Sequence, residues 1–187
     1  MKGQNTDTAW QIVRRQSLVT TPWASVDLVD FRLPNDRGVH NYLIVDQPPV
    51  CVVLPLLGGK TFLIEEYERG IDRIGYKLPG GRIDPDESPE VAARREAKEE
   101  LGITACTMTR LGLASVDPGR MTTLAHYFLA TEIVLNPSAK VEDPTELFTG
   151  SWTDIDTVAA MVDNNTIINP FVIVAFSLFR SHMRRHE

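Results

Sequence analysis

The stretch GGRIDPDESP, residues 80–89, runs directly into EVAARREAKEEL, residues 90–101, and together they decide the fold of this chain. Ser88 suits the N-cap of a helix, and Pro89 suits its first turn, where the missing N–H of proline costs nothing. Gly102 suits the left-handed residue that ends a helix. The sequence therefore predicts a central helix over residues 90–101, preceded by a polar loop.

The acidic side chains of this helix break two rules of local stability. Glu96 and Glu100 are like charges four residues apart, which costs free energy. Glu99 and Glu100 also lie at the negative end of the helix dipole, where cations are favoured. A divalent cation would offset both effects, and clustered carboxylates suit Mg²⁺, with Mn²⁺ as an alternative. The competing interpretation is a solvated helix face whose charges are neutralised by neighbouring Arg and Lys side chains.

The residues from Gly81 to Ile103 resemble the Nudix box, whose pattern is G-x5-E-x7-R-E-U-x-E-E-x-G-U, with U an aliphatic residue. A pattern with this many specified positions is much more specific than a lone glycine-rich motif. Every fixed position is matched, and Ala97 occupies the first aliphatic one. The matching polar and glycine residues are Gly81, Glu87, Arg95, Glu96, Glu99, Glu100 and Gly102.

This resemblance implies an enzyme, a Nudix pyrophosphohydrolase, that uses divalent metal ions to hydrolyse the diphosphate bond of a nucleoside diphosphate linked to another moiety. The products would be a nucleoside monophosphate and, for a sugar, a sugar phosphate. By resemblance, Glu99 and Arg95 act in catalysis, with Arg95 orienting a carboxylate. The implied metal ligands are Gly80 (through its carbonyl), Glu96, Glu99 and Glu100, and the implied structural residues are Gly81, Glu87 and Gly102.

Features outside the box are similar to the branch that hydrolyses ADP-ribose and nucleotide sugars. Residues 1–47 look like the section through which that branch forms homodimers, and Pro118-Gly119 stands where it carries Ser-Pro-Gly. The branch often places its general base in a late acidic loop. Glu146 is the first candidate for that base and Glu142 the second. The candidates for binding the substrate are Arg69 and Arg120, through its phosphates, together with Pro118 and Gly119.

The chain also departs from this branch. Lys77 stands where the branch usually has glutamate, and Asp117 replaces the serine before Pro-Gly. The leading hypothesis is hydrolysis of ADP-ribose or another nucleoside diphosphate sugar. Two alternatives stay open: hydrolysis of a non-nucleotide diphosphate, and a ligand-sensing module that has kept the fold without turnover.

The composition limits the class of protein. At 187 residues the chain suits one main domain, taken as residues 48–187 after the N-terminal β section of residues 1–47. A net charge of −6 argues against nucleic acid or a membrane surface as partner. The two cysteines, far apart in apolar stretches, predict buried thiols in the cytoplasm. The expected partner is a small-molecule diphosphate.

The order of the predicted elements favours a fold of the α/β (α+β) class. We expect a Nudix-type α/β/α sandwich with a mixed β-sheet, preceded by the small antiparallel β section. A tight hairpin is predicted at Gly58-Gly59, and a polar connection is predicted over residues 68–76. Strands are expected at residues 10–13, 25–33, 40–45, 50–57, 61–67, 108–116 and 123–133, and further helices at 155–163 and 170–185.

Overall fold

The structure is a computed structural model that describes residues 8–140 and 148–185 of the 187-residue chain. The chain forms two compact units. The first comprises the described residues up to Pro48 together with Ser115–Thr123, and the second comprises Pro49–Ala114 and the described residues from Leu124 onward. Each unit is described by itself below.

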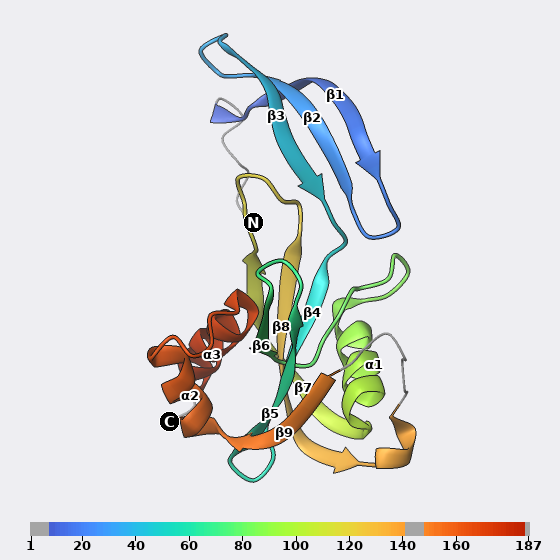
Figure 1. Ribbon diagram of the computed structural model, residues 1–187, viewed down its shortest axis with the longest axis vertical. Helices are drawn as coiled ribbons and strands as arrows, with labels where there is room; N and C mark the ends of the chain where they lie inside the picture. Colours follow the sequence, from blue (N-terminus) through green and yellow to red (C-terminus); the bar gives the residue numbers. More distant parts are fainter. Residues whose placement is uncertain (1–7, 141–147, 186–187) are drawn as a thin grey trace. The chain divides into compact units, whose positions relative to one another are not determined.

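The first unit is an antiparallel sheet of three strands, in the order β1-β2-β3 (Figure 1). These strands are β1 (Gln11–Thr20), β2 (Ser25–Arg32) and β3 (Gly38–Asp46). The prediction that the first strand ends at residue 13 is wrong. All ten residues of β1 are exposed, so no alternation of buried and exposed side chains marks its length, which pairing with β2 sets instead.

The second unit contains two sheets of three strands. One has the order β4-β8-β7, with β4 (Val50–Pro55) parallel to β8 (Leu124–Leu135) and β7 (Ile103–Ser115) next to β8. The other has the order β6-β5-β9, in which β5 (Lys60–Glu68) is antiparallel to both neighbours. The remaining elements are β6 (Arg73–Lys77), β9 (Phe148–Asp154), α1 (Pro89–Leu101), a 3-10 turn η2 (Pro137–Ala139), α2 (Ile155–Asp163) and α3 (Pro170–Met183).

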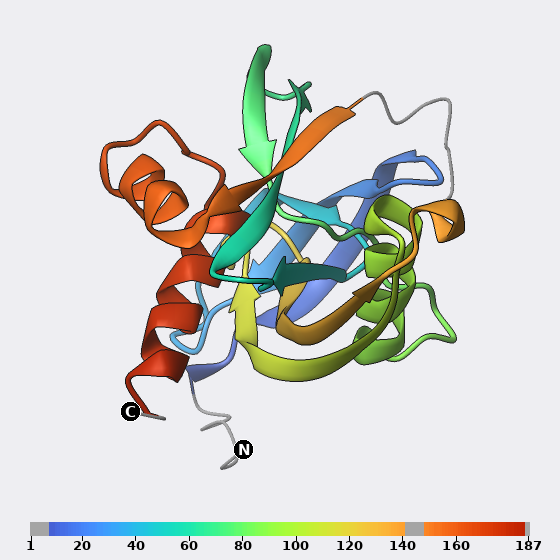
Figure 2. The ribbon, with the colours of Figure 1, turned by 90° about the horizontal axis from the view of Figure 1, so that it is seen from below.

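The strand β4 is buried on both faces and lies at the centre of the sandwich. Its side chains alternate in direction: Cys51 and Val53 pack with Ala92 and Ala93 of α1, whereas Val52 and Leu54 pack with residues of α2 and α3. Helices therefore cover both faces of β4 and β8 (Figures 1 and 2). The expected α/β/α arrangement with mixed strand directions is confirmed.

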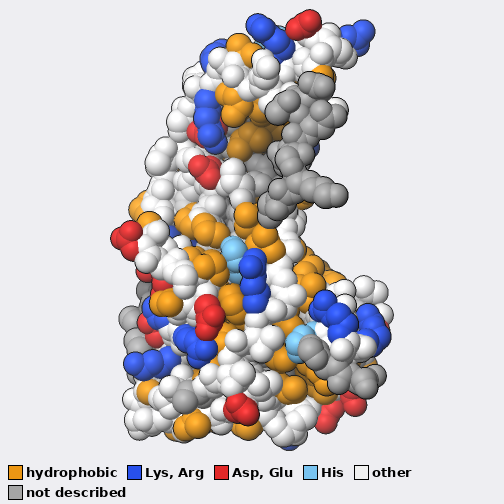
Figure 3. All heavy atoms as spheres, turned by 180° about the vertical axis from the view of Figure 1, so that it is seen from behind, with side chains coloured by type: hydrophobic (Ala, Val, Ile, Leu, Met, Phe, Trp, Pro, Cys, Tyr) orange, Lys and Arg blue, Asp and Glu red, His pale blue; other side chains and the backbone are white. Residues whose placement is uncertain are grey.

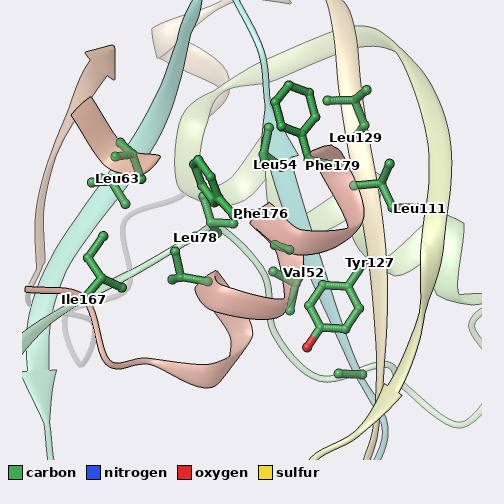
Figure 4. Close-up of a cluster of buried hydrophobic side chains, with 14 residues drawn as sticks. Val52, Leu54, Leu63, Leu78, Leu111, Tyr127, Leu129, Ile167, Phe176 and Phe179 are labelled. Atoms are coloured by element: carbon green, nitrogen blue, oxygen red, sulfur yellow. The ribbon is translucent and has the colours of Figure 1, made fainter. Parts of the chain in front are cut away.

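The larger of the two cores lies between β4, β8 and the C-terminal helices. Phe176 is the largest fully buried side chain, and Leu54, Ile167 and Val172 are also less than 2% exposed. Figure 4 shows Phe176 and Phe179 of α3 among leucine side chains, which come from the strands and, for Leu78, from the segment after β6. The face of α1 on the other side is built from small residues, so that helix lies close to the sheet.

The central helix begins and ends as the sequence predicts. Ser88 is the N-cap and its side chain accepts a hydrogen bond from the N–H of Val91, with Pro89 in the first turn. Gly102 is the left-handed C-cap, at φ 71°. Pro89 occupies the first helical position, as predicted.

Two further predictions about the strands need correction, and one strand is missing from the predictions. Gly58 and Gly59 form a tight turn with positive φ at both residues, and Leu57 and Lys60 exchange two backbone hydrogen bonds across it. The flanking strands do not stay paired, because β4 and β5 join different sheets. Residues 73–77 form β6 instead of a connection. The strand β9 is not predicted, because Gly150 and Ser151 interrupt any apolar pattern.

Candidate functional site

The polar loop before α1 is fixed to β4 by backbone hydrogen bonds. Cys51 N–H donates to the carbonyl of Gly81 at 2.9 Å, and Val53 N–H donates to the carbonyl of Pro79 at 2.8 Å. Gly80 has φ 145°, and a Cβ there would lie 2.1 Å from the carbonyl oxygen of Cys51. Glycine is therefore required where the loop passes the strand.

The second glycine leaves room for a glutamate of α1. A Cβ added to Gly81 would lie 2.3 Å from Oε1 of Glu96. The carboxylate of Glu96 thus lies directly against the loop backbone, and its side chain is 14% exposed. The two neighbouring glycines have separate roles, since one lies against strand β4 and the other against helix α1.

The guanidinium of Arg95 joins three carboxylates of the box. Its Nε and Nη2 donate to the two oxygens of Glu87, at 3.0 and 2.9 Å. Its Nη1 donates to both Glu96, at 2.8 Å, and Glu99, at 3.1 Å. Nη2 also donates to the carbonyl of Arg82 at 3.0 Å. This bidentate arrangement on Glu87 needs the planar fork of arginine.

These contacts favour the charged forms of Glu87 and Arg95. The hydrogen bonds from Arg95 lower the pKa of the Glu87 carboxyl, and those from Arg95 to Glu87, followed by Glu96 and Glu99, raise the pKa of Arg95. Charged hydrogen-bond partners favour the charged form of each group. Glu87 and Arg95 are therefore both ionised at neutral pH.

Glu100 lies apart from this cluster and is buried, with a side chain that is 4% exposed. Its Oε2 accepts the N–H of Gly80 at 2.8 Å, and its Oε1 lies 3.8 Å from Nζ of Lys77. The same Nζ lies 2.6 Å from Oε2 of Glu66, whose side chain is largely buried. Lys77 and Glu66 of the sheet β6-β5-β9 therefore extend the site.

Sequence reasoning assigns no role to Glu66 or Lys77. A usable signal lies in the alternation of side chains, since Glu66 pairs with Gly75 and Ile64 pairs with Lys77 in the antiparallel ladder. This register places Glu66 and Lys77 diagonally on one face. Predicting a connection over residues 68–76 hides this signal, because it removes the strand that carries Lys77.

The predicted phosphate-binding residues fall in different places. Arg69 lies beside the site, with Nη2 3.7 Å from Oε1 of Glu66 and a side chain that is 75% exposed. Arg120, Pro118 and Gly119 belong to the first unit, where the carbonyl of Arg120 accepts Val45 N–H. Their proposed contact with a substrate remains a prediction. The base candidates Glu142 and Glu146 lie outside the described residues.

The donor groups of this site fit a hard divalent cation in their chemistry. Carboxylates and a backbone carbonyl are the oxygen ligands that Mg²⁺ and Mn²⁺ accept, and Glu96 already fills the space left by the missing side chain of Gly81. In residues 8–140 and 148–185, no three acidic, histidine or cysteine side chains converge as a formed metal site. Glu96 and Glu99 instead share Nη1 of Arg95.

A hollow of about 450 Å³ lies on the other face of the sheet β6-β5-β9. Glu65 and Tyr76 line it, and these residues neighbour Glu66 and Lys77 along the chain but point the opposite way. The hollow is therefore separate from the cluster around Arg95.

None of the helices described here has the length and hydropathy needed to cross a bilayer.

Known proteins resemble this chain over the residues that form the site. The family model described as the NUDIX domain matches residues 46–171. The chain is 24% identical over 138 residues to the ADP-ribose pyrophosphatase of Bacillus subtilis (strain 168), covering 74% of this chain and 75% of that protein. It is 29% identical over 110 residues to the ADP compounds hydrolase NudE of Escherichia coli (strain K12), covering 58% and 59%.

A solved structure described as an ADP compounds hydrolase matches the fold, with a TM-score of 0.80 and coverage of 95% of each chain. Its sequence identity is 20%, so this likeness concerns the fold alone.

Replacing Arg95 with lysine is expected to lower the free energy of unfolding by about 2 kcal/mol, because one ammonium cannot replace the fork that holds Glu87 while also bonding Glu96 and Glu99. Urea unfolding measures the change. The matched control is Arg94→Lys on the same helix, whose pair with Glu90 is exposed, and about 0.5 kcal/mol or less is expected there. Equal losses in the two variants would contradict the assigned role of Arg95.

Proposed function

Because this chain belongs to the NUDIX domain family and is a pyrophosphohydrolase, we propose that it hydrolyses the diphosphate bond of ADP-ribose or another nucleoside diphosphate sugar. Two relatives that are named for ADP-ribose or ADP compounds support this substrate class. The products would be a nucleoside monophosphate and a sugar phosphate. Nudix hydrolases generally use divalent metal ions, and Mg²⁺ is the ion proposed here, with Mn²⁺ as a substitute.

The observation that carries this proposal is the cluster of carboxylates around Arg95. One guanidinium lies within 3.1 Å of oxygens of Glu87, Glu96 and Glu99. Concentrating so many negative charges on one helix opposes folding unless cations offset them. Holding the loop to the helix needs only the pair of Arg95 with Glu87, whereas the further carboxylates of Glu96 and Glu99 suit a site that binds the charged diphosphate through cations.

We assign the metal ligands to Glu96, Glu99, Glu100 and the carbonyl of Gly80. A bound divalent ion would neutralise diphosphate charge and polarise the bond that breaks. Arg95 positions Glu96 and Glu99 by hydrogen bonds, and Glu87 in turn holds the guanidinium in place. The N–H of Gly80 holds Glu100, so the loop and the helix orient each other's groups.

Two further roles are proposed for groups outside this cluster. Arg69 is a candidate for binding phosphate, because its guanidinium is largely exposed beside Glu66. Arg120, with Pro118 and Gly119, is proposed to contact substrate from its own unit. The general base is proposed to be Glu146, with Glu142 as the alternative, following the position of the acidic loop in the chain.

The proposed homodimer has support from the surface of the first unit. Several large apolar side chains of residues 8–48 are exposed: Trp10, Ile12, Val13, Leu18, Val19 and Trp23. Figure 3 shows hydrophobic side chains reaching the surface of the molecule. Exposed apolar patches commonly mark interfaces, so the section up to residue 47 is proposed to pair two copies. A cytoplasmic location is proposed from the free thiols of Cys51 and Cys106.

A product screen tests the proposed substrate class. Purified protein is incubated with nucleotide sugars, dinucleotides and non-nucleotide diphosphates, in Mg²⁺, in Mn²⁺ and in EDTA, and products are separated by chromatography. We expect ADP-ribose or a related sugar to yield a nucleoside monophosphate, with no reaction in EDTA. Preference for a non-nucleotide diphosphate would overturn the substrate, and ion binding without turnover on any compound would favour a sensing module.

Replacing Glu99 with glutamine is expected to lower the maximal rate at least about a hundredfold, because the change removes a negative charge from the proposed ligand set while keeping the side-chain shape. Steady-state kinetics measure the rate, and circular dichroism checks the fold. The control is Glu90→Gln, which removes an exposed carboxylate from the same helix and is expected to leave the rate unchanged. Near-native turnover in Glu99→Gln would rule out its assignment as a ligand.

A further inference from the structure

Lys77, the last residue of β6, lies between two carboxylates, that of Glu66 in β5 and that of Glu100 at the end of α1. Its ammonium lies 2.6 Å from Oε2 of Glu66 and 3.8 Å from Oε1 of Glu100. The Lys77 side chain is 28% exposed, whereas those of Glu66 and Glu100 are 14% and 4% exposed, respectively. Of the two carboxylates that Lys77 contacts, that of Glu100 is therefore the more strongly shielded from water.

A nearby cation stabilises the charged form of Glu100. It is buried, and it lies in the last turn of α1, where the helix dipole favours positive charge. Removing a carboxylate from water is costly unless it is paired and hydrogen-bonded. Gly80 N–H satisfies one oxygen, and Lys77 places a positive charge beside the other. The chain therefore supplies this charge itself.

The other two proposed carboxylate ligands, Glu96 and Glu99, are paired with a guanidinium instead of an ammonium. Glu96 and Glu99 share one nitrogen of Arg95, and that guanidinium also bonds both oxygens of Glu87. The Glu99 side chain is in addition 38% exposed. The positive charge of the site is consequently uneven, with an ammonium beside Glu100 and a guanidinium divided among three carboxylates on the side of Glu96 and Glu99.

We propose that the Lys77 ammonium competes with a divalent ion for the carboxylate of Glu100, so that this chain binds an ion at Glu100 more weakly than the same site would without the lysine. This inference rests on the proposed function, because it concerns the ions that the box residues hold. Lys77 is a positioning residue here: it pairs with Glu100, which remains a proposed ligand, and offsets part of the negative charge that would otherwise attract the ion.

Ion binding to metal-free protein tests this inference without relying on turnover. Titration calorimetry with Mn²⁺ is applied to the wild type, Lys77→Gln, Lys77→Met and Lys77→Arg. Removing one positive charge a few ångströms from a divalent ion is expected to tighten its binding about tenfold, or to add one ion per chain. Lys77→Arg should behave as the wild type, because it retains the charge.

The matched control is Lys60→Gln, which removes an exposed lysine from β5 in the same sheet. It is expected to bind Mn²⁺ as the wild type does. Lys77→Met keeps the apolar stem of the side chain, so it serves if the glutamine variant does not fold. Unchanged affinity and stoichiometry in both Lys77→Gln and Lys77→Met would overturn the inference.

Thermal unfolding separates this role from a purely structural one. Without metal, Lys77→Gln should melt at a lower temperature than the wild type, because Glu66 and Glu100 lose a cation. Saturating Mn²⁺ should then raise the melting temperature more in the variant than in the wild type. A lower melting temperature with the same Mn²⁺ shift in both proteins would mean that Lys77 only stabilises the fold.

The two proposals fail in different ways. If the wild type binds no Mn²⁺ but Lys77→Gln does, the lysine excludes the ion and the inference stands, while the proposed metal dependence of the native enzyme is wrong. If neither protein binds Mn²⁺, both proposals are overturned. If both bind it equally and the wild type is active, the proposed function stands and the role of Lys77 is wrong.

Discussion

The hydrogen-bonded fork between Arg95 and Glu87 is the interaction on which the rest of the site depends. Glu87 comes from the loop before α1 and Arg95 from its second turn, so the fork ties the loop to the helix. The same guanidinium then bonds Glu96 and Glu99. Without this cation, the carboxylates of one helix would repel each other, and the loop would keep only its bond from Gly80 to Glu100 as an attachment to the helix among those described here.

The packing of α1 against β4 holds Arg95 in position to bond Glu87. Ala92 and Ala93 are fully buried against Cys51 and Val53 of β4, which brings the helix backbone close to the strand. The loop that contains Gly80 bonds to that same strand. Loop and helix are therefore both positioned by one buried strand, and the carboxylates occupy the space that the glycines leave open.

The sequence predicts the parts of this structure that depend on local chemistry. Ser88 and Gly102 mark the ends of α1 because capping is decided by a few neighbouring residues. Likewise, the spacing along a single helix is enough to group Glu96, Glu99 and Arg95. The strand β6 and the pairing of Lys77 with Glu66 and Glu100 depend on contacts between segments far apart in the chain, and hydrophobic periodicity carries little information about such contacts.

The central claim is that the carboxylates grouped by Arg95 are a site for divalent cations. Crystals grown with Mn²⁺ and a non-hydrolysable ADP-ribose analogue would test it most directly, since anomalous scattering locates each ion. The account predicts an anomalous peak in contact with the carboxylates of Glu96 and Glu99. An ion bound elsewhere, with both carboxylates still bonded to Arg95 at Mn²⁺ concentrations that support turnover, would contradict it.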